Sequence, residues 1–162
     1  MWYHKKNIEQ RLFAGPSTIS YHVFFIMHNQ PRPLYLVSAC LAGLCTRYDG
    51  SVKADETCLR LLQDATWIPV CPEQLGGLST PREPADIVGG NGDDVLLGNA
   101  RVVTVGGTDV TRAYVNGAFQ VLAVARSQPV DAVFLKARSP SCGSAGVTAA
   151  LLRQHRFRLQ EF

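Results

Sequence analysis

Short apolar runs alternate along the chain with segments in which apolar residues recur at helical spacing. Four of the runs have the length of buried strands and are rich in β-branched or aromatic residues. The predicted strands are Leu34–Ser38, Trp67–Val70, Arg101–Val105 and Ala132–Lys136. Because helical segments lie between them, the pattern predicts an α/β fold with a mostly parallel sheet covered by helices on both faces. This arrangement is a Rossmann-like, three-layer architecture.

Three segments carry the helical pattern, with apolar residues on one face and polar residues between them. The predicted helices are Ala54–Asp64, Val110–Ser127 and Val147–Gln154. Asp109 or Thr111 is placed to cap the longest of them. The glycine-rich stretch Gly89–Asp94 predicts a loop that divides the chain into two parts of one sheet.

The 162 residues are enough for one domain, which we expect to span residues 34–162. Residues 1–33 lack the strand and helix pattern and predict a disordered N-terminal extension, within which Met27 is an alternative start. The apolar run Tyr21–Met27 is too short for a signal peptide and no cleavage site follows it. No run reaches the length of a membrane span. We therefore expect a cytoplasmic protein.

The net charge of the chain argues against one class of binding partner, duplex nucleic acid. Net charge is +3, and the sequence contains no long basic run. A protein that binds duplex nucleic acid usually has a stronger basic surface. A small molecule is therefore the expected partner.

Five cysteines, an odd number, together with the lack of a signal peptide, argue against a disulfide framework. Three of them follow predicted strands. Cys40 comes two residues after the first strand, and Cys71 follows the second strand directly. Cys142 comes six residues after the last strand. Ligands of open α/β sheets bind beyond the carboxyl ends of the strands. The spacing therefore predicts that Cys40, Cys71 and Cys142 meet at one site.

Three converging thiolates suit a metal centre, but their spacing along the sequence does not decide which metal they bind. Structural zinc sites usually use close Cys-x-x-Cys pairs, and this sequence has none. An iron–sulfur cluster accepts ligands scattered along the chain, and three ligands on four irons leave one iron open as a Lewis acid. Zinc and unliganded thiols remain alternatives. Cys45 is either a fourth ligand or a packed thiol, and Cys58 is expected in the core.

Polar residues near these cysteines are candidates for chemistry or for local structure. Glu73 can move protons, or it can simply favour a helix N-terminus. Ser139 can hold a substrate or a water, or form a turn. Lys53 and Arg82 can bind an anion, and Asp49 lies in a predicted turn beside them in sequence.

Three ordered motifs carry a family resemblance. The first spans Ser38–Gly50 with Cys40 and Cys45, the second Val70–Arg82 with Cys71, and the third Leu135–Gly143 with Cys142. Together they resemble the motifs of the thiouracil desulfidase (TudS) family over about Leu34 to Leu152. The resemblance implies a [4Fe-4S] cluster bound by Cys40, Cys71 and Cys142.

The resemblance also implies an activity. The open iron of the cluster binds the sulfur of a thiolated uracil, and Glu73 and Ser139 assist hydrolysis. The reaction is non-redox, because thiouracil and water give uracil and sulfide. The substrate-binding residues expected around this centre are Asp49, Lys53 and Arg82. The enzyme is then a hydrolase or lyase of the desulfidase kind that acts on a small thiolated pyrimidine.

The sequence departs from the family at one place. Relatives carry a further segment after the third motif, whereas here Gly143-Ser144-Ala145 leads directly to Gly146–Leu152. We expect a tight turn there, a pocket more open beside Cys142, and slower turnover. We expect no fused domain of the kind that tRNA-directed relatives carry, and therefore a free base or nucleotide as substrate.

Two other functions compete with a desulfidase. One is a metal- or cluster-binding module without catalysis. The other is a thiol-based enzyme that uses Cys45 or Cys142 directly. The four histidines lie outside the motifs. This weakens the hypothesis of an enzyme in which a histidine activates a cysteine nucleophile.

Overall fold

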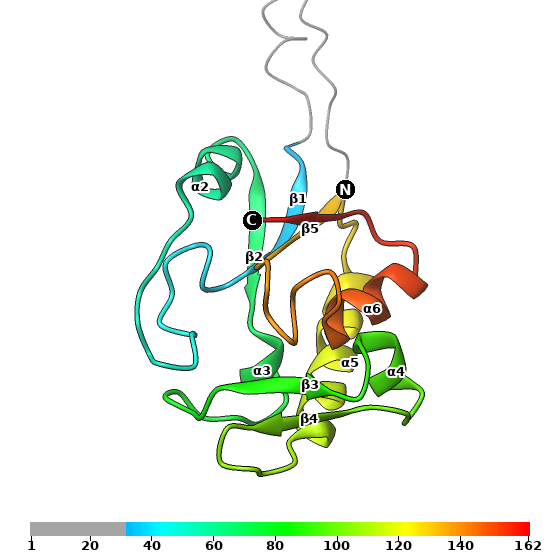
Figure 1. Ribbon diagram of the computed structural model, residues 1–162. Coiled ribbons are helices and arrows are strands. Elements are labelled where there is room, and N and C mark those ends of the chain that lie inside the picture. The colour runs from blue at the N-terminus through cyan, green and yellow to red at the C-terminus, as the bar shows by residue number, and fades with distance from the viewer. Residues whose placement is uncertain (1–31) are drawn as a thin grey trace, which may run out of the picture. The chain divides into compact units, whose positions relative to one another are not determined.

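The computed structural model describes residues 32–162 (Figure 1). The expectation of a disordered extension over residues 1–33 falls almost entirely outside these residues.

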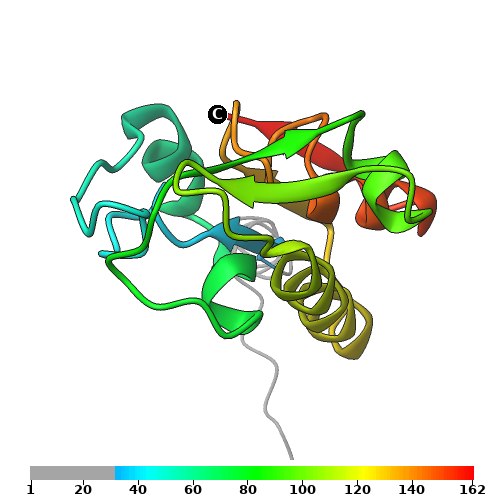
Figure 2. The ribbon, with the colours of Figure 1, turned by 60° about the horizontal axis from the view of Figure 1, so that its bottom comes forward.

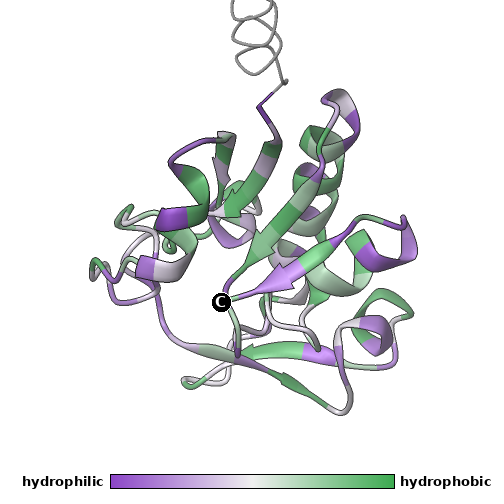
Figure 3. Ribbon diagram, turned by 90° about the horizontal axis from the view of Figure 1, so that it is seen from above, coloured by the Kyte–Doolittle hydropathy of each residue, from purple (hydrophilic) through white to green (hydrophobic). Residues whose placement is uncertain are grey.

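A four-stranded parallel sheet forms the centre of the described part. Its strand order is β2-β1-β5-β6, and each neighbouring pair is parallel. The strands are β1 (Leu34–Ser38), β2 (Thr66–Val70), β5 (Ala132–Leu135) and β6 (Leu159–Glu161). This confirms the predicted mostly parallel sheet. Strand β6 was not predicted, because it has three residues and ends on polar side chains, as the hydropathy colouring of Figure 3 shows.

Helices cover both faces of this sheet because successive strand residues point to opposite sides. Leu36, Val133 and Leu135 pack on one face in a cluster with residues of α5 (Thr111–Ser127) and α6 (Val147–Gln154). On the other face, α2 (Glu56–Leu62) contributes Cys58 and Leu62 to a second cluster with Val37, Ala132 and Phe134. The three-layer architecture is confirmed, and each fully buried aliphatic side chain contributes about 1.5–3 kcal/mol.

Helix boundaries follow local hydrogen bonding. Helix α2 is shorter than predicted because Asp55 caps it, accepting a hydrogen bond from the Cys58 backbone at 3.0 Å. Helix α5 begins at Thr111, whose backbone N–H donates to the Asp109 carboxylate at 2.9 Å. Helix α6 begins and ends where the sequence predicts.

The run Arg101–Val105 is not a strand of the central sheet. Strand β4 (Arg101–Thr104) instead pairs antiparallel with β3 (Ala85–Val88) in a separate two-stranded sheet (Figure 2). Val102 is fully buried, whereas Val105 is 83 % exposed, so this run has one apolar face rather than two. Strands from before and after the Gly89–Asp94 stretch still form one sheet, as expected, and only the assignment of Arg101–Val105 to that sheet is wrong.

Two short helices were not predicted. Helix α4 (Gly92–Leu96) begins inside the stretch expected to be a loop, because Asn91 and Asp94 form a reciprocal capping box. Helix α3 (Pro72–Leu75) follows Cys71 directly. A Cβ atom at Gly117 would lie 1.8 Å from the Pro72 carbonyl oxygen, so glycine is required for α3 to approach α5. This approach brings the residues of α3 beside the first turns of α5.

Candidate three-cysteine site

A cavity of about 500 Å³ lies beyond the carboxyl ends of β1, β2 and β5. Residues that follow each of these strands line it, and Pro84, Ala85 and Tyr114 complete the lining. The chain runs from β1 to β2 on one side and reaches β5 on the other side of β1. Such a reversal of strand order is where open α/β sheets bind ligands.

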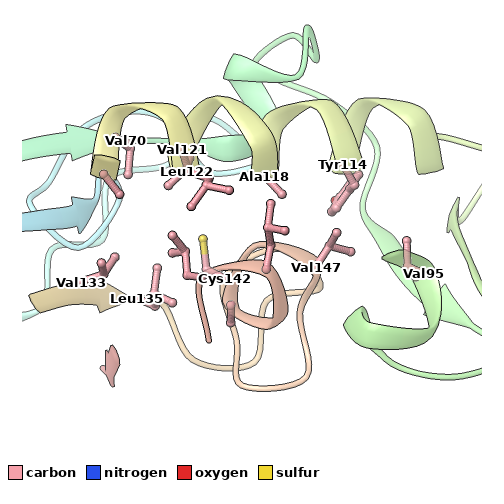
Figure 4. Packing of buried hydrophobic residues seen from close by; sticks show 14 of the residues in the cluster. Val70, Val95, Tyr114, Ala118, Val121, Leu122, Val133, Leu135, Cys142 and Val147 are labelled. Atoms are coloured by element: carbon pink, nitrogen blue, oxygen red, sulfur yellow. The ribbon is translucent and has the colours of Figure 1, made fainter. Parts of the chain in front are cut away.

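All three candidate ligand cysteines line this cavity. Cys40 and Cys71 are partly buried, and Cys142 is buried at 6 % exposure among the core side chains beneath α5 (Figure 4). The convergence expected from the strand ends is therefore observed, whereas the ligand role of the three residues stays a prediction.

The thiols lie near enough to one another to affect each other's charge. Burial raises the pKa of the Cys40 thiol and Cys71 raises it further, whereas Arg47 and Lys136 lower it. Burial raises the pKa of Cys142 to about 12, with further increases from Cys40 and Cys71 and an opposing hydrogen bond with Ser38. Three thiolates can therefore be held here together only with compensating positive charge, which a metal centre supplies.

The donor set is one that an iron–sulfur cluster uses, because cysteine thiolates are its usual ligands. Among residues 32–162, no three His, Cys, Asp or Glu side chains lie close enough to hold one metal ion. A zinc ion needs its ligands around one atom, whereas a four-iron cluster spreads its cysteine ligands around several. Cys40, Cys71 and Cys142 supply three thiol sulfurs at one cavity, a donor set whose chemistry fits a [4Fe-4S] cluster.

The other two cysteines lie elsewhere. Cys45 is exposed and does not line the cavity, so this geometry gives no support to a fourth ligand. Cys58 is fully buried in the cluster beneath α2, as expected, and burial raises its pKa to about 11.

Glu73 lines the cavity from the first turn of α3, where the helix dipole also favours a carboxylate. The guanidinium of Arg82 donates from Nε to Glu73 Oε2 at 2.6 Å, and both side chains are largely buried, with 8 % and 15 % exposure. Charge-assisted hydrogen bonds of this length are strong and fix orientation. Glu73 is thus held in place at the cavity wall.

Arg82 is committed to this network rather than free to bind an anion. Its Nη1 donates to the Ser79 carbonyl at 3.1 Å and to the Thr80 hydroxyl at 3.0 Å, and its Nη2 donates to the Thr46 carbonyl at 2.9 Å. The side chain therefore joins the loop after β1 to α3. The substrate-binding role expected for Arg82 remains a prediction, and the contacts indicate positioning of Glu73 instead.

Tyr114 is a site residue that sequence reasoning missed. It is 2 % exposed and lies on α5 opposite α3. Burial raises the pKa of Tyr114 well above its ordinary range, and the charge of Glu73 and a hydrogen bond with it add to this rise. A tyrosine on the apolar face of a helix is the available sequence signal, because a buried hydroxyl needs a partner.

Ser139 lines the cavity and also organises the loop that carries Cys142. Its hydroxyl oxygen accepts hydrogen bonds from the backbones of Ser141 at 3.2 Å and Cys142 at 3.1 Å. Because the oxygen accepts twice, the hydroxyl hydrogen remains available for donation. Ser139 therefore has the turn role and lies on the cavity lining, and its catalytic role stays a prediction.

Lys53 and Asp49 differ in their relation to the cavity. Lys53 lines it and is exposed. Asp49 lies outside the lining, where hydrogen bonds from Ser51 lower its pKa and hold it in a local turn. It pairs with Arg47, a lining residue, at 3.4 Å.

A tight turn follows Cys142, as the short third motif predicts. Gly146 N–H donates to the Gly143 carbonyl at 2.6 Å, and Val147 N–H donates to the Pro140 carbonyl at 3.0 Å as α6 begins. The degree to which this turn opens the cavity stays a prediction.

The fold and the cavity define an α/β protein with a three-cysteine site whose donors suit an iron–sulfur centre. The family model described as 2-thiouracil desulfurase matches residues 35–161, and the chain belongs to this family.

Two individual proteins support this membership. The chain is 47 % identical over 141 residues to the uncharacterized protein YbbK of Bacillus subtilis (strain 168), covering 78 % of this chain and 93 % of YbbK. A solved structure described as a [4Fe-4S]-dependent thiouracil desulfidase, TudS, superposes with a TM-score of 0.67 at 34 % identity, covering 82 % of this chain and 91 % of that one.

Among residues 32–162 no helix is long and apolar enough to cross a membrane.

Proposed function

We propose that this protein removes sulfur from a thiolated uracil with a [4Fe-4S] cluster held by Cys40, Cys71 and Cys142. The observation that carries the proposal is the meeting of these three cysteines and Glu73 on one strand-end cavity. Membership of the 2-thiouracil desulfurase family and the likeness to a [4Fe-4S]-dependent thiouracil desulfidase support it.

The cluster, when bound, supplies an iron without a cysteine ligand that acts as a Lewis acid toward the soft sulfur of the substrate. The cysteines supply three thiolates. Arg47 and Lys136 stabilise negative charge at Cys40, since both lower its pKa. The overall reaction balances as thiouracil plus water to uracil plus hydrogen sulfide, so no external oxidant or reductant is needed.

Glu73 takes up the proton of the attacking water in this proposal. Arg82 occupies Oε2 of Glu73, which leaves Oε1 to face other partners. Arg82 and Tyr114 fix the carboxylate against rotation, and a general base must lie within hydrogen-bond reach of its water. The two residues therefore act as positioning residues for Glu73.

Ser139 donates its hydroxyl hydrogen to the pyrimidine ring as charge develops during attack. Lys53, on the cavity lining, contributes a cation toward the carbonyl oxygens of the substrate. Asp49 acts on substrate binding through Arg47, with which it pairs. This assignment keeps the expected residues but gives Arg82 a positioning role.

The test is anaerobic reconstitution of the full chain with iron and sulfide, followed by an assay of sulfide release from 2-thiouracil and from 4-thiouracil. We expect a brown protein that releases sulfide from at least one isomer. Iron uptake without sulfide release from either isomer would favour the alternative of a cluster-binding module, which the shortened segment after Cys142 makes a specific competitor.

A matched pair of variants tests the ligands. Cys40→Ala removes a proposed ligand and should abolish cluster binding, whereas Cys45→Ala removes an exposed thiol outside the cavity and should retain it. Iron content per chain is the measurement. Equal loss of iron in both variants would make Cys45 a ligand and remove the open iron from the proposal.

A further inference from the structure

Strand β6 is short and lies at the edge of the central sheet, beside β5. Burial does not explain its two polar side chains, because Gln160 and Glu161 are both exposed. In the register of the strand pair, Glu161 lies opposite Leu135, the last residue of β5. The loop that carries Ser139 and Cys142 begins directly after Leu135. Glu161 therefore stands at the base of this loop.

The end of the chain around β6 contacts the loop at two points. At the start of the loop, Ala137 N–H donates to the Phe162 carbonyl at 2.8 Å, and Lys136 Nζ donates to the same oxygen at 3.1 Å. At the far end, Ser144 N–H donates to Oε1 of Glu161. The two candidate site residues of the loop lie between these points of attachment.

The loop itself is tightly wound between the two points. Gly143 N–H donates to the Ser139 carbonyl at 2.8 Å, and a Cβ atom at Gly143 would lie 2.9 Å from the same carbonyl oxygen. Only one residue separates Cys142 from Ser144. A displacement of Ser144 is therefore passed to the thiol of Cys142, although Glu161 does not touch that thiol.

The attachment at Ser144 depends on a single side chain. The acceptor is a carboxylate, and hydrogen bonds to ionised groups are stronger than those between neutral groups. Ser144 is exposed, so without Glu161 its N–H would bond to water and this end of the loop could open locally. The contact thus holds the loop closed without contributing to the buried core.

We propose that Glu161 is a positioning residue for Cys142, because its hydrogen bond to Ser144 keeps the loop that carries this cysteine closed at the cavity. The consequence for a bound cluster rests on the proposed function. The consequence for the loop does not, because the contact is made by the protein alone.

The first test measures how fast iodoacetamide alkylates each cysteine of the metal-free full chain, resolved by mass spectrometry. A buried thiol reacts when the structure around it opens. Cys142 reports opening of the loop, and Cys58, fully buried on the other face of the sheet, reports opening of the whole domain. Glu161→Ala removes the acceptor, whereas Glu161→Gln keeps an oxygen that can accept the same hydrogen bond. Gln160→Ala, one residue earlier on β6, is the matched control.

We expect Cys142 to react about fivefold faster in Glu161→Ala, the factor for the loss of one hydrogen bond, and Cys58 to keep its rate. Glu161→Gln should keep most of the protection, and Gln160→Ala should keep all of it. An unchanged rate at Cys142 would overturn the inference. Equal acceleration at both cysteines would also overturn it, because Glu161 would then stabilise the whole domain. A rate in Glu161→Gln as high as in Glu161→Ala would assign the effect to charge and refute the role of the hydrogen bond.

The second test uses the same variants after anaerobic loading with iron and sulfide, and it measures the rate of iron loss to a chelator. A ligand on a loop that opens more often leaves its metal more often, so Glu161→Ala should lose iron about fivefold faster than the unaltered chain. Gln160→Ala should lose it at the unaltered rate. If Cys142 is more reactive in metal-free Glu161→Ala but iron loss is unchanged, Glu161 does not position this cysteine for a cluster.

The two tests separate this inference from the proposed function. If the unaltered chain takes up iron and Glu161→Ala matches it in both measurements, only the role of Glu161 is refuted. If the unaltered chain takes up no iron, the proposed function is refuted, and alkylation of the metal-free chain still decides whether Glu161 holds the loop closed.

Discussion

The two walls of the cavity are built in different ways. The wall that carries Glu73 depends on side chains from distant parts of the chain, since Arg82 connects to Thr46, 36 residues away, and Tyr114 comes from α5. The wall that carries Ser139 and Cys142 is a local loop, closed by the hydrogen bond from Gly143 N–H to the Ser139 carbonyl and by that from Val147 N–H, at the start of α6, to the Pro140 carbonyl.

This difference separates two functions of the site. The side-chain hydrogen bonds of the first wall fix the orientation of the Glu73 carboxylate. Single side-chain changes can loosen this wall and leave the cysteines in place. The loop of the second wall fixes Cys142 and the Ser139 hydroxyl relative to β5, independently of changes in the wall that carries Glu73. We therefore expect changes in the first wall to affect turnover more than cluster binding, and changes in the second wall to depend on loop length.

The largest effect should come from Glu73→Gln. The carboxamide keeps the shape of the side chain but cannot take up a proton, so turnover should fall by about 10²–10⁴-fold. Iron content should be unchanged, since Glu73 is not among the proposed ligands. Activity assays and iron analysis on the same preparation provide the measurement, and unimpaired turnover would assign the base to another group.

The second largest effect should come from substitutions of Arg82. Arg82→Met leaves the largely buried Glu73 without its cation, and breaking such a pair commonly costs about 3–5 kcal/mol, so the free energy of unfolding should fall markedly. Arg82→Lys keeps the charge but lacks the planar fork, and should retain most stability while kcat falls about tenfold.

The control for Arg82→Lys is Arg153→Lys, at a more exposed ion pair with Asp93. Its kcat should remain unchanged. A rise in KM with unaltered kcat in Arg82→Lys would contradict the positioning role and restore the expectation that Arg82 binds the substrate.

A smaller effect is expected from Tyr114→Phe, which removes one hydroxyl and keeps the buried ring. The Glu73 carboxylate loses the neighbouring hydroxyl, so kcat should fall about five- to tenfold, the factor for the loss of one hydrogen bond of about 1 kcal/mol. Iron content and KM should be unchanged. Tyr35→Phe is the matched control, because Tyr35 packs on Phe134 in the cluster beneath α2. Equal turnover in the two variants would leave Tyr114 with a packing role alone.

The sequence predicted the wall that carries Ser139 and Cys142 well, and it predicted the wall that carries Glu73 poorly. Strand β1 and helix α6 have the predicted bounds, because their apolar patterns end at polar or glycine residues. The convergence of Cys40, Cys71 and Cys142 followed from their places after parallel strands. Each of these predictions depends on local patterns and one rule of sheet topology.

The contacts of Glu73 were not predictable in the same way. Arg82 reaches Glu73 across a nine-residue separation that contains no regular periodicity, so no spacing rule identifies the pair. Tyr114 meets Glu73 only because Gly117 lets α3 approach α5 closely. Strand β4 was predicted as a strand but assigned to the central sheet, and its partner β3 was missed because its four residues include the charged Asp86.

The last prediction concerns the length of the local loop. An insertion of family-like length between Ser144 and Ala145 should enclose the cavity beside Cys142, hold the substrate better and limit water, so kcat/KM should rise about three- to tenfold. Cys142 precedes the insertion and keeps its hydrogen bond to Ser139, so iron content should be retained. Ala145 accepts a hydrogen bond from Gly92, so some loss of stability is expected and an insertion of equal length between Gly89 and Gly90 serves as the control. If the unaltered chain already matches longer relatives in kcat/KM, or if the insertion adds nothing, the added segment is dispensable and the short loop is sufficient for turnover.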